Sequence, residues 1–191
     1  MEFDQIITDA SEQIKIGYKR GTNRILFIKT GQGGSIYGYE NKYINLARTI
    51  NEKYGFSVLV SATTNDCKEI YDKEMQIVDQ IFQNVFYELY YMGISKGGLI
   101  GCWYGTGNHR IKKMVLINAP LMINFHNLTL PSIKKYPQDK LTMIYGSLDP
   151  SSRYVDFVTP YATVKIVTGA DHQFRHHTEM FENIAIDLIS N

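Results

Sequence analysis

The sequence predicts an α/β protein: one domain over residues 1–191, built as a three-layer α/β/α sandwich around a mostly parallel sheet. Short apolar runs typical of strands alternate along the chain with segments whose apolar residues recur every three or four positions, as on one face of a helix. The strand-like runs are apolar at consecutive positions, which indicates burial on both faces. A sheet buried on both faces needs helices on each side, and strands joined through helices run parallel to one another.

The strands and helices can be assigned in order along the chain. Residues 25–29 read Ile-Leu-Phe-Ile-Lys and predict a strand, and a further strand is expected before it at 13–19. Residues 42–54 predict a helix, because their apolar residues fall on one helical face. The remaining expected elements are a strand at 57–62, a helix at 69–84, a strand at 88–94, a helix at 97–107, strands at 112–118, 140–146 and 163–167, and a final helix at 175–189.

Composition and charge exclude several classes of function. Hydrophobic residues make up 44% of the chain and charged residues 20%, as in an average globular domain. The 20 Lys and Arg against 19 Asp and Glu leave a net charge of +1, which argues against nucleic acid or an acidic membrane as a partner. Two cysteines, Cys67 and Cys102, are too few for a disulfide framework or a Cys-rich zinc site. With neither a secretory signal nor a membrane span apparent, we expect a cytoplasmic protein.

The main chemical signal is the pattern Gly93-x-Ser95-x-Gly97, which lies where the predicted strand 88–94 meets the predicted helix 97–107. A sharp strand-to-helix turn forces its middle residue into strained backbone angles, and the residues two positions away must lack bulk. Glycine at both flanking positions and a nucleophile between them meet this requirement. The structural alternative is a Gly-rich helix start with a capping serine.

Three motifs in chain order resemble those of one family. Residues 93–98, Gly-Ile-Ser-Lys-Gly-Gly, resemble the nucleophile elbow of the α/β-hydrolase superfamily. Residues 146–149, Gly-Ser-Leu-Asp, are similar to the family's acid loop, and residues 169–172, Gly-Ala-Asp-His, are similar to its histidine loop. Each follows a predicted strand, as in that family, and the resemblance covers about residues 14–191.

The resemblance implies a serine, acid and histidine triad formed by Ser95, Asp149 and His172. A serine hydroxyl is a poor nucleophile at neutral pH unless a base takes its proton, and His172 is the candidate base. Asp149 is expected to orient the imidazole and to stabilise its charged form. Asp171 is the alternative acid, although its position next to the histidine makes a hydrogen bond to the ring awkward.

An oxyanion hole needs two N–H donors. The family takes one from the residue after the nucleophile, which is Lys96 here. The second comes from a loop that often begins His-Gly, and aligning Thr30-Gly31 to that pair puts the donor at the backbone N–H of Gln32. Because threonine replaces histidine, Gly33 stays open as the donor, and the glycines can also form a simple strand-to-helix connection.

The substrate site is expected to be open. Only residues 119–139 separate the predicted strands 112–118 and 140–146, where relatives often insert a lid, and this is too short for a separate domain. We expect Gly33, Tyr37 and Leu121 to contact the substrate.

The sequence therefore predicts a serine hydrolase that cleaves an ester or thioester through an acyl-serine intermediate, as in small uncapped esterases and thioesterases. The same triad serves a peptidase, an amidase or an acyltransferase, and a hydrolase fold without activity can act as a binding protein. The expected partner is a small acyl substrate. We expect no cofactor, because the glycine-rich segment lacks the third glycine of a dinucleotide site, where Ile36 stands. We expect no metal, because the histidines at 172, 176 and 177 have no evident third ligand beside their i, i+4 pair. The sequence does not define the oligomeric state.

Overall fold

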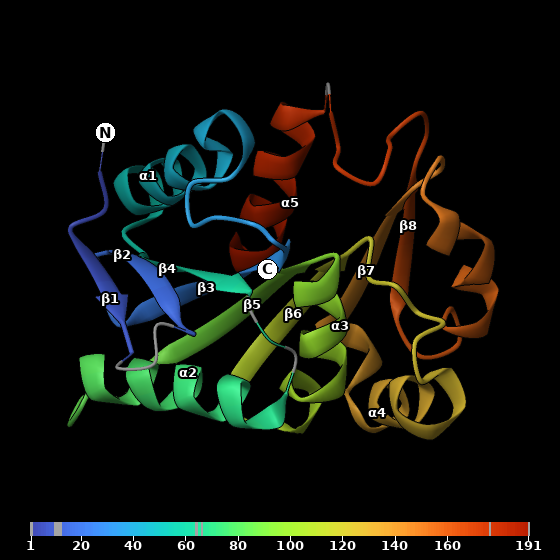
Figure 1. Ribbon diagram of the computed structural model, residues 1–191, viewed down its shortest axis with the longest axis horizontal. Coiled ribbons are helices and arrows are strands. Elements are labelled where there is room, and N and C mark those ends of the chain that lie inside the picture. The colour runs from blue at the N-terminus through green and yellow to red at the C-terminus, as the bar shows by residue number, and fades with distance from the viewer. Residues whose placement is uncertain (1, 10–12, 64, 66, 176, 191) are drawn as a thin grey trace.

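The computed structural model describes residues 2–9, 13–63, 65, 67–175 and 177–190, which contain one eight-stranded sheet (Figure 1). The strands lie in the order β1-β2-β4-β3-β5-β6-β7-β8. Their bounds are β1 Gln5–Thr8, β2 Lys15–Lys19, β3 Arg24–Gln32, β4 Ser57–Thr63, β5 Glu88–Ile94, β6 Ile111–Ile117, β7 Leu141–Gly146 and β8 Thr163–Val167. The helices are α1 Lys42–Tyr54, α2 Lys68–Ile81, α3 Lys96–Trp103, α4 Leu130–Lys135 and α5 Thr178–Ser190.

The sheet is mostly parallel, as predicted. Strands β3 to β8 run parallel to one another, whereas β1 pairs with β2, and β2 with β4, in antiparallel fashion. The carboxyl ends of β3, β5, β6, β7 and β8 therefore lie at the same edge of the sheet, which is where open α/β sheets bind their ligands.

Helices cover both faces of this sheet and form the three predicted layers (Figure 1). Alternate residues of β3 point to opposite faces: Leu26 and Ile28 pack with α1 and α5, and Ile25 and Phe27 pack with α2 and α3. All four side chains are fully buried. This double burial explains why the central strands are apolar at consecutive positions.

The sequence predicts most elements closely and misses two. The predicted helix at 42–54 and strand at 163–167 coincide with α1 and β8. The predicted helix at 97–107 is too long, because α3 ends at Trp103 and a short 3-10 turn follows. The sequence does not predict β1, a four-residue edge strand with mostly exposed side chains, or α4, a six-residue helix. Short elements lack the several periods that make a pattern recognisable.

The region between β6 and β7 packs into the fold and forms no separate lid. It contains a π-helical turn at Phe125–Thr129, then α4. The indole N–H of Trp103, in α3, donates a hydrogen bond of 2.9 Å to the hydroxyl of Thr129, which ties this region to the body of the protein. Within the described part of the chain, no helix combines the length and apolar composition that a membrane crossing requires.

A buried ion pair joins β3 to α2. The ammonium of Lys29 contacts one carboxylate oxygen of Glu74, and both side chains are at most 1% exposed. The hydroxyl of Ser61 also donates to this oxygen and accepts from Lys29 at 3.3 Å. Burial lowers the pKa of Lys29 and raises the pKa of Glu74, and each group opposes the shift in the other. The second oxygen, Oε2 of Glu74, has no hydrogen-bond partner among the described residues.

We expect Glu74→Ala to lower the free energy of unfolding by about 3–5 kcal/mol, because it leaves the ammonium of Lys29 buried without its carboxylate. Urea denaturation followed by circular dichroism measures this loss. The double variant Lys29→Met/Glu74→Leu is the control, and it should regain most of the stability because no charge remains buried. A loss below about 1 kcal/mol in Glu74→Ala would show that the buried charge of Lys29 does not depend on Glu74 for its stability.

Candidate active site

Ser95 lies in the sharp turn between β5 and α3. Its backbone angles are φ 51° and ψ −116°, in a region that residues with a side chain rarely adopt. Its backbone N–H donates a hydrogen bond of 2.7 Å to the carbonyl of Ile117, at the end of β6, so the turn is held by the neighbouring strand. Strain of this kind is concentrated at functional sites.

The glycines around Ser95 are required by close backbone contacts. A Cβ atom on Gly97 would lie 2.2 Å from the carbonyl oxygen of Lys29 in β3, and one on Gly93 would lie 2.5 Å from the carbonyl oxygen of Gly97. These distances are too short for any side chain. The Gly-x-Ser-x-Gly pattern therefore reflects the packing of β3, β5 and α3 around the turn.

The structure brings the predicted Ser95, His172 and Asp149 together in a row. Nε2 of His172 lies 2.9 Å from Oγ of Ser95. Nδ1 of the same ring is hydrogen-bonded to Oδ2 of Asp149. Asp149 is only 2% exposed, and its other oxygen accepts the backbone N–H of Ser151 at 2.7 Å. The imidazole is exposed and can reach a substrate, whereas the carboxylate behind it is shielded from water.

The carboxylate changes the proton affinity of the ring. Its hydrogen bond to His172 raises the pKa of the imidazole, partial desolvation opposes this, and the charges of Asp149 and Asp171 add to the increase. A carboxylate on Nδ1 stabilises the charged imidazole, so the ring can accept a proton from Ser95 more readily than a histidine without that partner.

Asp171, the alternative acid, has other partners. Its Oδ1 accepts the backbone N–H groups of Gln173 and Arg175 at 3.1 and 3.0 Å, and its Oδ2 lies 3.3 Å from Nε of Arg175. Desolvation would raise the pKa of Asp171, but these N–H groups and the charge of Arg175 lower it below its usual value. Asp171 thus orders its own loop, while the described contact to the ring of His172 comes from Asp149.

The end of β3 lies directly beside the serine. A Cβ atom on Gly31 would lie 3.2 Å from Cβ of Ser95, so the backbone that leads into Gln32 passes next to the nucleophile. Gln32 is the last residue of β3, and Lys96 is the first residue of α3. The two predicted donor residues therefore flank the turn. Gly33 follows with φ 66°, in an open position.

The three residues predicted to contact the substrate have different surroundings. Gly33 is exposed beside the site. Tyr37 is half-buried, and its ring packs against Phe3 at a centroid distance of 5.9 Å. Leu121 is fully buried in the core shared with α3 and α4, so its side chain does not reach an open cleft.

Sequence analysis did not single out Asn118, the residue that follows β6. Its side chain is fully buried, and its amide hydrogen-bonds to the backbone of both segments that carry Asp149 and His172. The only sequence signal is a polar residue directly after an apolar strand. That signal becomes informative once the strand is known to end at the edge that carries the serine.

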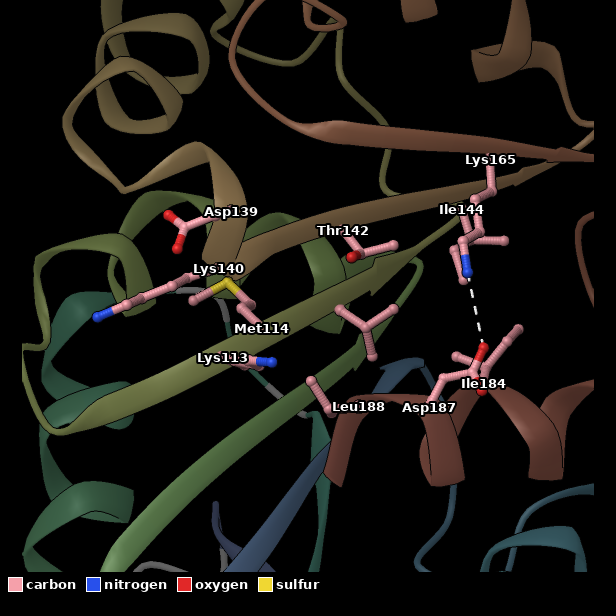
Figure 2. A pocket seen from close by; sticks show the side chains of 11 residues that line it. Lys113, Met114, Asp139, Lys140, Thr142, Ile144, Lys165, Ile184, Asp187 and Leu188 are labelled. Atoms are coloured by element: carbon pink, nitrogen blue, oxygen red, sulfur yellow. Dashed lines mark ion pairs between the residues drawn. The ribbon is translucent and has the colours of Figure 1, made fainter. Parts of the chain in front are cut away.

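A cavity of about 190 Å³ lies between α5 and strands β6 to β8 (Figure 2). Its described lining comes from these elements and from the residues just before β7, and it includes the ion pair between Lys165 and Asp187 at 3.6 Å. Ser95, Asp149 and His172 are not part of this lining, so the cavity lies apart from the candidate site.

No protein-family model and no curated protein matches the sequence, but solved structures match the fold. Est1E from Butyrivibrio proteoclasticus superposes with a TM-score of 0.73 at 17% identity, over 98% of this chain and 99% of its own. An alpha-beta serine hydrolase homologue from Coxiella burnetii gives 0.71 at 12%, over 99% of each chain. A lidless serine hydrolase from Xanthomonas campestris gives 0.70 at 13%, over 97% and 92%. The chain has the α/β-hydrolase fold.

We expect the imidazole of His172 to titrate above the ordinary histidine value of about 6.5, because Asp149 stabilises its protonated form. NMR titration of the histidine rings measures this pKa, with the resonance assigned by its loss in His172→Gln. Asp149→Asn should lower the pKa clearly, whereas Asp171→Asn should lower it little. A wild-type pKa at or below 6.5 would contradict the described contact.

Proposed function

We propose that this protein is a serine hydrolase that cleaves an ester or thioester through an acyl intermediate on Ser95. The observation that carries the proposal is the continuous row from Oγ of Ser95 through both ring nitrogens of His172 to the buried carboxylate of Asp149. This arrangement provides a nucleophile, a base and a group that orients the base.

In the first step, Nε2 of His172 takes the proton of Ser95 while Oγ attacks the acyl carbonyl carbon. The charged imidazole is stabilised by Asp149, which keeps its own negative charge. The tetrahedral intermediate then collapses, the bond to the leaving alcohol or thiol breaks, and His172 returns the proton to that leaving group. Water attacks the acyl-Ser95 ester in the same way, which releases the acid and restores the free serine.

The oxyanion of each tetrahedral intermediate is proposed to accept hydrogen bonds from the backbone N–H groups of Lys96 and Gln32. The proximity of Gly31 to Ser95 supports this pairing, because the end of β3 lies beside the hydroxyl that makes the attack. Donors held by a strand end and a helix start need no rearrangement during the reaction. One such donor is worth about 10²–10³ in turnover. Gly33 remains the alternative second donor.

The kind of substrate is supported by the open site and by the structural neighbours. The region between β6 and β7 packs against α3, so Ser95 has no separate domain above it. A solved structure of Est1E holds ferulic acid, which makes a ferulate ester a reasonable member of a test panel. p-Nitrophenyl esters of increasing chain length, an acyl thioester, an anilide and methyl ferulate together separate an esterase from a thioesterase or an amidase.

We expect Ser95→Ala to abolish turnover of p-nitrophenyl esters and labelling by a fluorophosphonate, because both reactions need the hydroxyl of Ser95. Ser190→Ala, at the exposed end of α5, is the matched control and should keep wild-type rates. Wild-type turnover in folded Ser95→Ala would refute the nucleophile. A folded wild-type protein that neither labels nor cleaves any ester would favour a binding protein instead.

Asp149→Asn should lower turnover by a factor approaching 10⁴, because the amide favours the wrong imidazole tautomer. Asp171→Asn should lower it only about tenfold, since this residue affects His172 only through the order of their shared loop and through its charge. Both rates are compared on proteins of matched thermal stability. The acid assignment is wrong if Asp171→Asn proves the more damaging of the two.

A further inference from the structure

One buried side chain, that of Asn118, connects the three strand ends around the candidate site. Its Oδ1 accepts the backbone N–H of Gly146, at the end of β7, at 2.9 Å. Its Nδ2 donates to the backbone carbonyls of His172 at 2.9 Å and Asp171 at 3.2 Å. Its own backbone N–H donates to the carbonyl of Ile144, so the residue is fixed at both its main chain and its side chain.

The segments that it connects are already in tight contact. A Cβ atom on Gly146 would lie 2.3 Å from the carbonyl oxygen of Ala170, so these two stretches of backbone touch directly. The backbone N–H of Leu148 donates to the same carbonyl at 3.1 Å. Asp149 and His172 each lie within three residues of this contact, and the amide of Asn118 spans it.

We propose that Asn118 is a positioning residue that sets His172 at the correct place between Ser95 and Asp149, an inference that rests on the proposed function. His172 is exposed, so side-chain packing alone restrains its ring weakly. The backbone of His172 is instead fixed by a hydrogen bond: its carbonyl accepts from the buried amide of Asn118, the residue that follows β6. The same amide accepts the backbone N–H of Gly146, where the segment that carries Asp149 begins. One side chain therefore positions the backbone of both the base and the acid.

The chemistry of asparagine suits this place. The position needs a donor, an acceptor and a left-handed backbone, since φ of Asn118 is 48°. Asparagine offers both hydrogen-bonding groups and tolerates this conformation better than most residues. Glycine adopts the conformation freely but has no amide, which makes Asn118→Gly a test of the side chain with little backbone strain.

We expect Asn118→Gly to lower kcat for a p-nitrophenyl ester on the order of 10²-fold, because small misplacements of catalytic groups have effects of this size. The loss should fall on kcat more than on KM, since the residue does not touch the substrate. The pKa of His172, measured by NMR, should fall toward its ordinary value, because a displaced ring loses the hydrogen bond of Asp149. Asn84→Gly is the matched control: Asn84 has φ 65° in an exposed turn after α2, and its replacement should change neither quantity.

Unchanged kcat and unchanged His172 pKa in Asn118→Gly would overturn the inference, as would a loss of thermal stability without a change in that pKa. If Asn118→Gly fails to fold, Asn118→Asp makes the test, because it keeps the size and the acceptor for Gly146. Assayed at alkaline pH, where the carboxyl is ionised, the variant places an oxygen opposite the carbonyls of Asp171 and His172, so kcat should again fall about 10²-fold relative to the wild type at the same pH; wild-type kcat there would overturn the inference. Ser95→Ala in parallel separates the two proposals: turnover that survives it refutes the hydrolase mechanism, whereas turnover that needs Ser95 but not Asn118 refutes the positioning role alone.

Discussion

The contact between the backbone of β3 and the start of α3 determines where the candidate site lies. The carbonyl oxygen of Lys29 occupies the space that a side chain on Gly97 would need, so at this point strand and helix touch through main-chain atoms. This contact brings Gly31 against Ser95, and with it the residues proposed to supply the second oxyanion donor. One packing constraint thus places the nucleophile and the end of β3 together, and it leaves Ser95 in a conformation that only a well-held turn maintains.

The same residue, Lys29, also carries the buried charge next to this contact. Its ammonium reaches Glu74 on α2. A buried pair contributes little net stability compared with apolar residues, but breaking it is costly. The ion pair therefore ties the position of α2 to the strand whose end lies beside the nucleophile.

On the side of Ser95 where β7 and β8 end, backbone contacts between two loops fix the positions of Asp149 and His172. The loop that carries Asp149 and the loop that carries His172 meet at Gly146 and Ala170, and the amide of Asn118 bridges them from β6. Burial is uneven along the row, with the acid shielded and the base exposed. This difference in solvent exposure keeps the carboxylate in place and leaves the imidazole accessible to substrate and water.

The sequence by itself determined the fold class and most of the element bounds, because each depends on a local pattern such as an apolar run or a helical period. It also named Ser95, Asp149 and His172 as candidates, because the glycine-containing motifs after three predicted strands resemble those of the α/β-hydrolase superfamily. The tertiary structure decided what depends on segments far apart in the chain. It paired His172 with Asp149, 23 residues away, in preference to the adjacent Asp171, which bonds within its own loop to Arg175. It buried Leu121, and it gave Asn118 its partners, because a hydrogen bond across 54 residues exists only when parallel strands end at one edge of the sheet.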